Sequence, residues 1–217
     1  MPKITEAKRE SRRQQILDAA LACFSRNGFH NTTTADIVRE SGVAQGTLYL
    51  YFKTKDEIIA ALADDRHQGE AYITALAQSE PDPLQGLALL IEIFGGSLYD
   101  PRRNAMRRVG VQGWGEALRN PGVHESAVAG MHAVRRVIVR LIERGQKAGE
   151  FRSDIDPEAM TRILMATFQG LTLQATLGET LPFESIGAVM GDMIRKTLFT
   201  DTARTAAVSR SLLKPQE

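Results

Sequence analysis

Residues 31–55 read NTTTADIVRESGVAQGTLYLYFKTK, and this stretch decides the expected fold. Thr33 followed by Asp36 fits a capping box in which Asp replaces Glu, so a helix is expected to start just after Thr33. Ser41-Gly42 ends that helix, because glycine accepts the left-handed backbone that a sharp turn needs. A second helix follows the turn, and the order helix, glycine turn, helix predicts a helix-turn-helix motif.

The second helix is expected to run from about Ala44 to Phe52. At about 100° per residue, Ala44, Leu48 and Phe52 share one face, which we expect to pack inward. Gly46 and Leu50 then point away from the core. A glycine inside a helix costs roughly 1 kcal/mol relative to alanine, and Leu50 is an apolar side chain on an exposed face. Together they indicate a surface that another molecule approaches closely.

The outer face of this helix has the chemistry of DNA contacts. Gln45 can pair with an adenine edge, Leu50 can touch thymine methyl groups, and Thr47 can reach a base or a phosphate. Hydroxyl and ammonium groups suited to phosphate oxygens come from Tyr49, Tyr51, Lys53 and Lys55. A small helical corner with two half-buried tyrosines would account for Tyr51, but not for Gly46 and Leu50 together. We therefore predict that this helix reads DNA.

The run GVAQGTLYLYFKTKDE, residues 42–57, resembles the recognition helix of TetR-family transcriptional regulators. The hallmark of that family is a Thr-Leu-Tyr-x-Tyr/His-Phe core followed by Lys, and the resemblance extends over about residues 10–62. It implies an all-α protein with a three-helix DNA-binding head, a larger helical ligand-binding body, and a homodimer. The implied phosphate contacts are Thr33, Tyr49, Tyr51 and Lys55, and the implied base contacts are Gln45, Gly46, Thr47 and Leu50. Two departures, Ala44 in place of a hydroxyl residue and the apolar Leu50, imply an altered operator sequence.

Charge is distributed unevenly along the 217 residues, although the formal net charge is only +1. Residues 1–56 hold nine Lys/Arg and six Asp/Glu, a net charge of +3, whereas the remainder carries −2. A basic head on a slightly acidic body suits DNA binding. The first helix is expected over about Glu10–Asn27, with Gly28 as its stop. Its early basic residues suit either the DNA backbone and minor groove or a solvated helix end.

The single cysteine, Cys23, excludes an intrachain disulfide and fits a reducing cytoplasm. It lies on an apolar stripe of the first helix, so we interpret it as a core residue rather than a redox sensor. The sequence contains no apolar run of about 18 residues and no apolar signal core near its start. We therefore expect a cytoplasmic protein without a membrane partner.

Beyond residue 54 the sequence predicts only helices, which makes about nine in the chain. Proline after a capping residue marks several of the starts. The expected ranges are about 55–78, 83–99, 101–120, 123–148, 157–177 and 182–199. We divide the chain into a helix-turn-helix DNA-binding domain (1–54), a helical ligand-binding and dimerisation domain (55–200) and a weakly ordered tail (201–217).

The last two predicted helices each have apolar residues beyond those needed for one core face. The residues expected at a dimer interface are Gly170, Leu173, Leu177, Ile186, Val189, Met190 and Met193. The alternative is a single intramolecular core that uses both apolar stripes. The family resemblance favours a two-fold dimer, in which these helices of both chains form a four-helix interface.

A ligand pocket is predicted in the body, and helix 101–120 is its expected moving part because three glycines in six residues weaken it. The candidate lining residues are Phe94, Met106, Trp114, Met165, Phe168 and Gln169. Gln112 and His132 are further polar markers. The alternative for each of these residues is an ordinary place in the core.

Enzyme motifs are weak in this sequence. His124-Glu125 begins like the zinc motif HExxH, but Val128 occupies the second ligand position. No phosphate-binding glycine loop, GxSxG motif or cysteine pair is found, so we expect no enzyme, cofactor or metal. An all-helical metal-dependent enzyme is a remote alternative.

These observations predict a ligand-responsive transcriptional repressor. A homodimer would bind a palindromic operator in double-stranded DNA, and a small apolar or amphipathic effector would release it. A transcriptional activator with the same DNA-binding head, or a constitutive DNA-binding protein without an effector, is the alternative.

Overall fold

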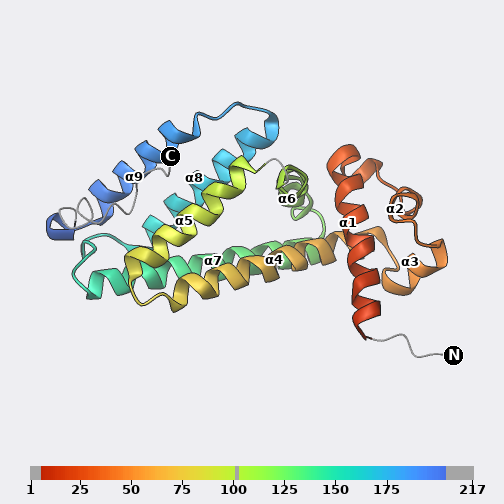
Figure 1. The fold of residues 1–217 in the computed structure, drawn as a ribbon, viewed down its shortest axis with the longest axis horizontal. Coiled ribbons are helices and arrows are strands. Elements are labelled where there is room, and N and C mark those ends of the chain that lie inside the picture. Colours follow the sequence, from red (N-terminus) through yellow and green to blue (C-terminus); the bar gives the residue numbers. More distant parts are fainter. Residues whose placement is uncertain (1–5, 101–102, 204–217) are drawn as a thin grey trace. The chain divides into compact units, whose positions relative to one another are not determined.

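The computed structural model describes residues 6–100 and 103–203, without the side chains of 65–74 and 99. Nine α-helices follow one another within these described residues (Figure 1). They are α1 (Glu6–Asn31), α2 (Thr34–Ser41), α3 (Gln45–Tyr51), α4 (Lys55–Ser79), α5 (Pro83–Tyr99), α6 (Asn104–Glu116), α7 (Pro121–Lys147), α8 (Pro157–Leu177) and α9 (Phe183–Leu198). The predicted all-α fold is confirmed. No described helix is long and apolar enough to cross a membrane.

Two of the predicted proline starts are confirmed with their caps. The Asp82 carboxylate accepts a hydrogen bond from the Leu84 backbone N–H at 2.8 Å, and Pro83 opens α5. The Asp156 carboxylate accepts one from the Glu158 backbone N–H at 2.9 Å at the start of α8. Asp82, which also accepts from the Gln85 N–H, thereby satisfies two of the backbone donors left over at a helix start, and Asp156 satisfies one.

Other predicted boundaries differ from the structure. Helix α1 begins earlier than expected, at Glu6, and is interrupted at Gly28, where its end was predicted. Helix α6 begins at Asn104, later than expected; Pro101 itself lies outside the described residues. Of the predicted tail, residues 201–203 are helical and 204–217 lie outside the described residues.

The chain divides into two compact units, which are described separately. Unit 1 comprises Met1–Gln68 and Arg102–Ala129, and unit 2 comprises Gly69–Pro101 and Gly130–Glu217. Unit 1 therefore joins α6 to the three N-terminal helices, because α6 packs on α1. The predicted DNA-binding domain, residues 1–54, is a smaller part of this unit, and its boundary stays a prediction.

Unit 1 has a core built from several helices. Its fully buried side chains include Ile16, Leu17, Phe24, Ile37, Leu48, Ile58 and Val123. The Phe24 and Phe29 rings meet edge to face at 4.9 Å between centroids, a favourable geometry for aromatic pairs. Cys23 is buried in the same core, and burial raises the pKa of its thiol. A buried thiol of raised pKa is unreactive, which fits the interpretation of Cys23 as a core residue.

Unit 2 has its own core, formed by α5, α7, α8, α9 and the segment that follows α7. The fully buried side chains include Leu141, Ile142, Phe151, Leu198 and Phe199. The Phe151 and Phe199 rings are stacked at 5.3 Å between centroids. The same two residues form an isolated antiparallel bridge. The chain after α7 is thereby held to the end of α9.

Candidate nucleic-acid interface

The corner between α2 and α3 has the predicted caps and turn. The Asp36 backbone N–H donates to the Thr33 hydroxyl at 3.2 Å, and the Thr33 backbone N–H donates to the Asp36 carboxylate at 2.9 Å. Helix α2 ends at Gly42, which has a left-handed φ of 67° and donates its N–H to Val38. The capping box and the glycine turn are confirmed, and they set the direction in which α3 leaves α2.

The Asp36 carboxylate is held in its ionised form. Hydrogen bonds from the Thr33 hydroxyl and then the Thr33 backbone N–H, followed by one from Arg39, lower the pKa of Asp36 to about 2. The Thr33 hydroxyl proton is therefore directed at this carboxylate, at 2.7 Å, and not at solvent. A phosphate contact by Thr33 would have to compete with the cap.

Helix α3 begins one residue later than predicted, which changes the place of Ala44. Ala44 is the N-cap, with an extended backbone (φ −65°, ψ 145°), and it is exposed. The prediction that Ala44 packs inward is therefore wrong, because an N-cap residue lies outside the helical spiral. Leu48 and Phe52 are buried as predicted, with exposed fractions of 0% and 5%.

The outer face of α3 is open to solvent. The Leu50 side chain is 80% exposed, and Tyr49 is 44% exposed. Gln45 and Gly46 are exposed as well, and Thr47 is half-buried. A Cβ placed on Gly46 would meet no heavy atom within 4 Å. Packing within the described part of unit 1 therefore does not require a glycine at this position.

The tyrosines of α3 have different surroundings. The Tyr49 hydroxyl lies 3.3 Å from the Thr34 hydroxyl in the first turn of α2. Tyr51 is half-buried and packs against the core of unit 1. Tyr49 thus has an exposed hydroxyl positioned by α2, whereas much of the Tyr51 ring serves packing.

Lys55 has an internal role that local sequence patterns did not indicate. Its ammonium group donates to the carbonyl oxygens of Phe29 at 2.6 Å and Thr32 at 3.1 Å. Two of its three donors are therefore directed at the end of α1. The neighbouring Lys53 side chain is exposed. Lys53 is thus the more accessible cation on this surface.

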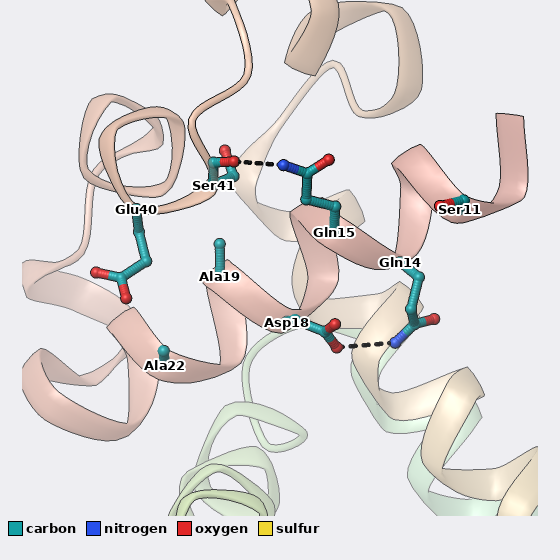
Figure 2. Close-up of a pocket in the computed structure, with 8 residues that line it drawn as sticks. All are labelled: Ser11, Gln14, Gln15, Asp18, Ala19, Ala22, Glu40 and Ser41. Carbon is teal, nitrogen blue, oxygen red and sulfur yellow. Dashed lines mark hydrogen bonds between the residues drawn. The ribbon is translucent and has the colours of Figure 1, made fainter. Parts of the chain in front are cut away.

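A polar groove lies between α1 and the end of α2 (Figure 2). It has a volume of about 770 Å³ and is lined by Ser11, Gln14, Gln15, Asp18, Ala19, Ala22, Glu40 and Ser41. Across it the Gln15 amide donates to the Ser41 carbonyl at 2.7 Å, which ties α1 to α2. Two carboxylates line the groove: that of Glu40 is paired with Arg26, and that of Asp18 accepts from the Gln14 amide at 3.0 Å. No basic side chain and none of the predicted ligand-binding residues is among the residues that line it.

The six predicted ligand-binding residues fall in both units. Met106 and Trp114 belong to unit 1, whereas Phe94, Met165, Phe168 and Gln169 belong to unit 2. Within unit 2 the Phe94 and Phe168 rings meet edge to face at 5.3 Å. The Gln169 amide lies 3.8 Å from the Met131 sulfur. Gln112 of unit 1, flagged as a polar marker, instead bonds to the backbone of α1.

The predicted dimer residues lie on partly open faces of α8 and α9. Leu173, Leu177, Val189 and Met193 are exposed, and Gly170, Ile186 and Met190 are half-buried. Ile163 and Ala166 are also exposed and continue the Gly170–Leu173–Leu177 series toward the start of α8. This spacing of alternating three and four residues gives one continuous apolar stripe. Ile163 and Ala166 are not among the residues that the sequence predicts at a dimer interface.

Comparison with known proteins gives two family matches. Residues 16–62 match the bacterial regulatory proteins of the tetR family, and residues 88–198 match the C-terminal region of BetI-type transcriptional repressors. The A-factor receptor protein of Streptomyces griseus is 31% identical over 74% of this chain, but the match covers only 53% of the receptor.

Two further relatives are matched over most of their length. The HTH-type transcriptional repressor Rv1474c of Mycobacterium tuberculosis is 26% identical over 82% of this chain and 90% of its own length. The structure of SmeT from Stenotrophomonas maltophilia in complex with triclosan is 26% identical, with a TM-score of 0.73 over 89% of this chain and 94% of SmeT.

Proposed function

The chain belongs to the TetR family of bacterial regulatory proteins, and from this premise we propose that it is a ligand-responsive repressor that binds a palindromic operator as a homodimer. The observation that carries the proposal is the outer face of α3. Leu50 is exposed there one helical turn from Gly46, where a Cβ would meet no heavy atom within 4 Å. A metal-dependent enzyme is set aside, because the family consists of regulators.

Helix α3 is proposed as the helix that enters the major groove. Its seven residues span about 10 Å, and the major groove, about 12 Å wide, admits a helix. The missing side chain at Gly46 lets the backbone approach the base edges. We propose base contacts by Gln45, Thr47 and Leu50, with Leu50 against thymine methyl groups.

Phosphate contacts are proposed on the flanks of α3. The Tyr49 hydroxyl is exposed and positioned by α2, and Lys53 offers an exposed ammonium group. Tyr51 and Lys55 are retained as proposed phosphate contacts, each with a second role inside unit 1. Thr33 is also retained as a proposed phosphate contact, for which its hydroxyl would have to leave the Asp36 carboxylate. Such contacts fix the register of a protein on DNA without reading sequence.

The apolar stripes of α8 and α9 support the proposed homodimer. An exposed series at helical spacing suits a second copy of the same surface, because most soluble homodimers have two-fold symmetry. Half-sites would then lie about one helical turn, or a multiple of it, apart along the operator, at about 10 to 10.5 base pairs per turn. The proposed site of action is the cytoplasm.

Leu173→Glu is expected to convert the protein to a monomer, because it places a charge in the centre of the proposed interface. Asn104→Glu, an exposed change on α6 and outside α8 and α9, is the control and should leave assembly unchanged. Sedimentation equilibrium of the two variants and the wild type checks this. A wild type that is already monomeric at micromolar concentration would refute the homodimer.

The effector is proposed to be a small apolar or amphipathic molecule bound by the body. The edge-to-face pair Phe94–Phe168 and the neighbouring Met165 and Gln169 supply apolar surface with one amide. SmeT, a similar protein, has been solved with triclosan. Effector and DNA must then weaken each other by the same factor. An activator, or a constitutive DNA-binding protein, is the alternative, and loss of operator binding on adding an effector would exclude the constitutive form.

Selection of bound DNA from a random pool tests the proposed function. The wild type should enrich a palindromic sequence. Tyr49→Ala is expected to weaken binding to this sequence and to unrelated DNA by a similar factor, because a phosphate contact is lost. Gln45→Ala should instead relax the preference at one base pair of each half-site, at a cost of about 1–3 kcal/mol.

Gln174→Ala is a control for these variants, since Gln174 lies on α8 and outside unit 1. It should bind the selected sequence as the wild type does. If the wild-type protein enriches no sequence at moderate salt, the proposed function is wrong. If Tyr49→Ala changes base preference while Gln45→Ala does not, the assignment of roles on α3 is wrong.

A further inference from the structure

Helix α1 is broken at Gly28 shortly before it reaches α2. Gly28 has φ 80° and ψ 166°, a conformation that is essentially restricted to glycine. In an unbroken helix the Phe29 N–H would donate to the Ser25 carbonyl. The break takes these two groups out of that register, so each needs a partner from another part of the chain.

Helix α6 provides both partners. The Gln112 side-chain oxygen accepts from the Phe29 N–H at 3.1 Å, and Arg108 Nε donates to the Ser25 carbonyl at 3.1 Å. The Gln112 amide nitrogen also donates to the Phe24 carbonyl at 3.2 Å. Residues 108 and 112 are four apart and therefore share one helix face. One face of α6 thus completes the hydrogen bonding on both sides of the break.

The segment after the break, residues 29–32, is held on its other side by α4. The Lys55 ammonium donates to the Phe29 and Thr32 carbonyls, and the Thr32 hydroxyl donates to the Gly28 carbonyl at 2.8 Å. Thr33, the next residue, is the N-cap of α2. The segment therefore links α6 to the start of the helix-turn-helix corner through four consecutive residues.

His30 of α1 makes further polar contacts with the end of α6 and the turn after it, where Glu116 is buried and Arg119 is exposed. Arg119 lies 3.1 Å from the His30 imidazole nitrogen, and His30 lies 3.7 Å from the Glu116 carboxylate. Contacts whose His30 and Arg119 side chains are largely exposed contribute little. The bonds of Gln112 and Arg108 are different, because they satisfy backbone groups that the break in α1 leaves without their helical partners.

We infer that Gln112, assisted by Arg108, is a positioning residue that couples the place of α6 to the helix-turn-helix corner through the break in α1. A shift of α6 by roughly 1 Å is enough to stretch bonds of 3.1–3.2 Å beyond hydrogen-bonding distance. Residues 29–32 then lose their hydrogen bond to α6. The position of Thr33, the N-cap of α2, is consequently less tightly fixed. The inference rests on the proposed function for its consequence on DNA, but the coupling itself concerns only unit 1.

Amide hydrogen exchange in the full-length protein tests the coupling directly. In Gln112→Ala the Phe29 amide is expected to exchange at least about tenfold faster than in the wild type, because it loses its acceptor. The Asp36 amide at the start of α2 should also exchange faster, whereas the Leu141 amide of unit 2 should not change. Asn104→Ala, an exposed change on the same helix, is the control and should leave all three amides unchanged.

Two further variants separate coupling from general destabilisation. Gln112→Glu keeps an acceptor for the Phe29 N–H but loses the donor to Phe24, so its Phe29 amide should stay closer to the wild type. Arg108→Ala removes only the bond to Ser25, and it keeps the test available if Gln112→Ala does not fold. All variants are compared at a temperature where circular dichroism shows each to be fully folded. A general loss of stability would speed exchange at many amides, whereas a loss of coupling speeds it at Phe29 and Asp36.

The DNA probe is the sequence that the wild type selects from a random pool. Gln112→Ala is expected to bind it about tenfold more weakly, with the same base preference and the same salt dependence, since Gln112 touches no DNA. Unchanged affinity, or unchanged exchange at Phe29 or Asp36, would overturn the inference. If the wild type selects no sequence, the proposed function fails, and exchange at Phe29 and Asp36 alone then decides the coupling.

Discussion

Leu48→Ala is expected to lower the free energy of unfolding of unit 1 by about 2–5 kcal/mol. Leu48 is the fully buried residue by which α3 packs on the core shared with Ile16 and Ile37. Truncation removes buried methyl groups and leaves a cavity, because close-packed neighbours relax only in part. Since α3 has only seven residues, it has little stability of its own to offset this loss. Urea unfolding followed by circular dichroism measures the change.

Leu50→Ala is the matched control, with the same substitution two residues along the same helix. Leu50 is 80% exposed, so its truncation should change stability by less than about 0.5 kcal/mol. Binding to the selected operator should instead suffer in Leu50→Ala, because a proposed base contact is lost. Equal effects of the two variants on stability would contradict the assignment of Leu48 to the core and Leu50 to the DNA-binding face.

Gly145→Ala is expected to destabilise unit 2 by about 1–3 kcal/mol, although alanine is the better helix former. A Cβ at Gly145 would lie 2.7 Å from Phe151 Cγ and closer still to two other carbons of that ring. The ring cannot move aside easily, because Phe151 is 1% exposed and stacked on Phe199. The Gly145 carbonyl also accepts from the backbone N–H groups of Glu150 and Phe151, so a shift of α7 would disturb both bonds.

Gly96→Ala is the corresponding change at an open position of the same unit. Gly96 lies within α5, is exposed, and a Cβ there would meet no heavy atom within 4 Å. Alanine should therefore stabilise the protein, by at most about 1 kcal/mol. Thermal unfolding of the two variants should show shifts of opposite sign. If Gly145→Ala is stabilising, the Phe151 ring is able to move away from the added methyl group, and the prediction is wrong.

Local interactions explain the parts of the fold that could be predicted from the sequence. The Thr33–Asp36 capping box, the Gly42 turn and the proline starts of α5 and α8 depend on groups within a few residues of one another. The helix-turn-helix corner and the exposure of Gly46 and Leu50 followed from these boundaries and from helical periodicity. The same approach failed at Ala44, because a helix start displaced by one residue changes the direction of a side chain.

The body was less predictable, because its candidate site depends on which helices meet. Composition indicated apolar residues suited to a ligand, but Met106 and Trp114 belong to unit 1 and the other four candidates to unit 2. The late start of α6 at Asn104, whose N-cap Arg103 makes no side-chain capping bond, also had no clear local signal. The family resemblance supplied the expected architecture, but not the place of each side chain within it.

The sequence by itself determined the helix-turn-helix corner, its caps and the face that α3 turns outward, since these follow from bonds and periodicities within one or two helical turns. Only the tertiary structure decided the roles of Lys55 and Gln112. The partners of Lys55 lie 23 and 26 residues away, and those of Gln112 lie 83 and 88 residues away. All four are backbone groups, whose chemistry is the same at every residue, so no side-chain pattern marks them. These backbone groups become the partners of Lys55 and Gln112 because α4 and α6 pack against the broken end of α1.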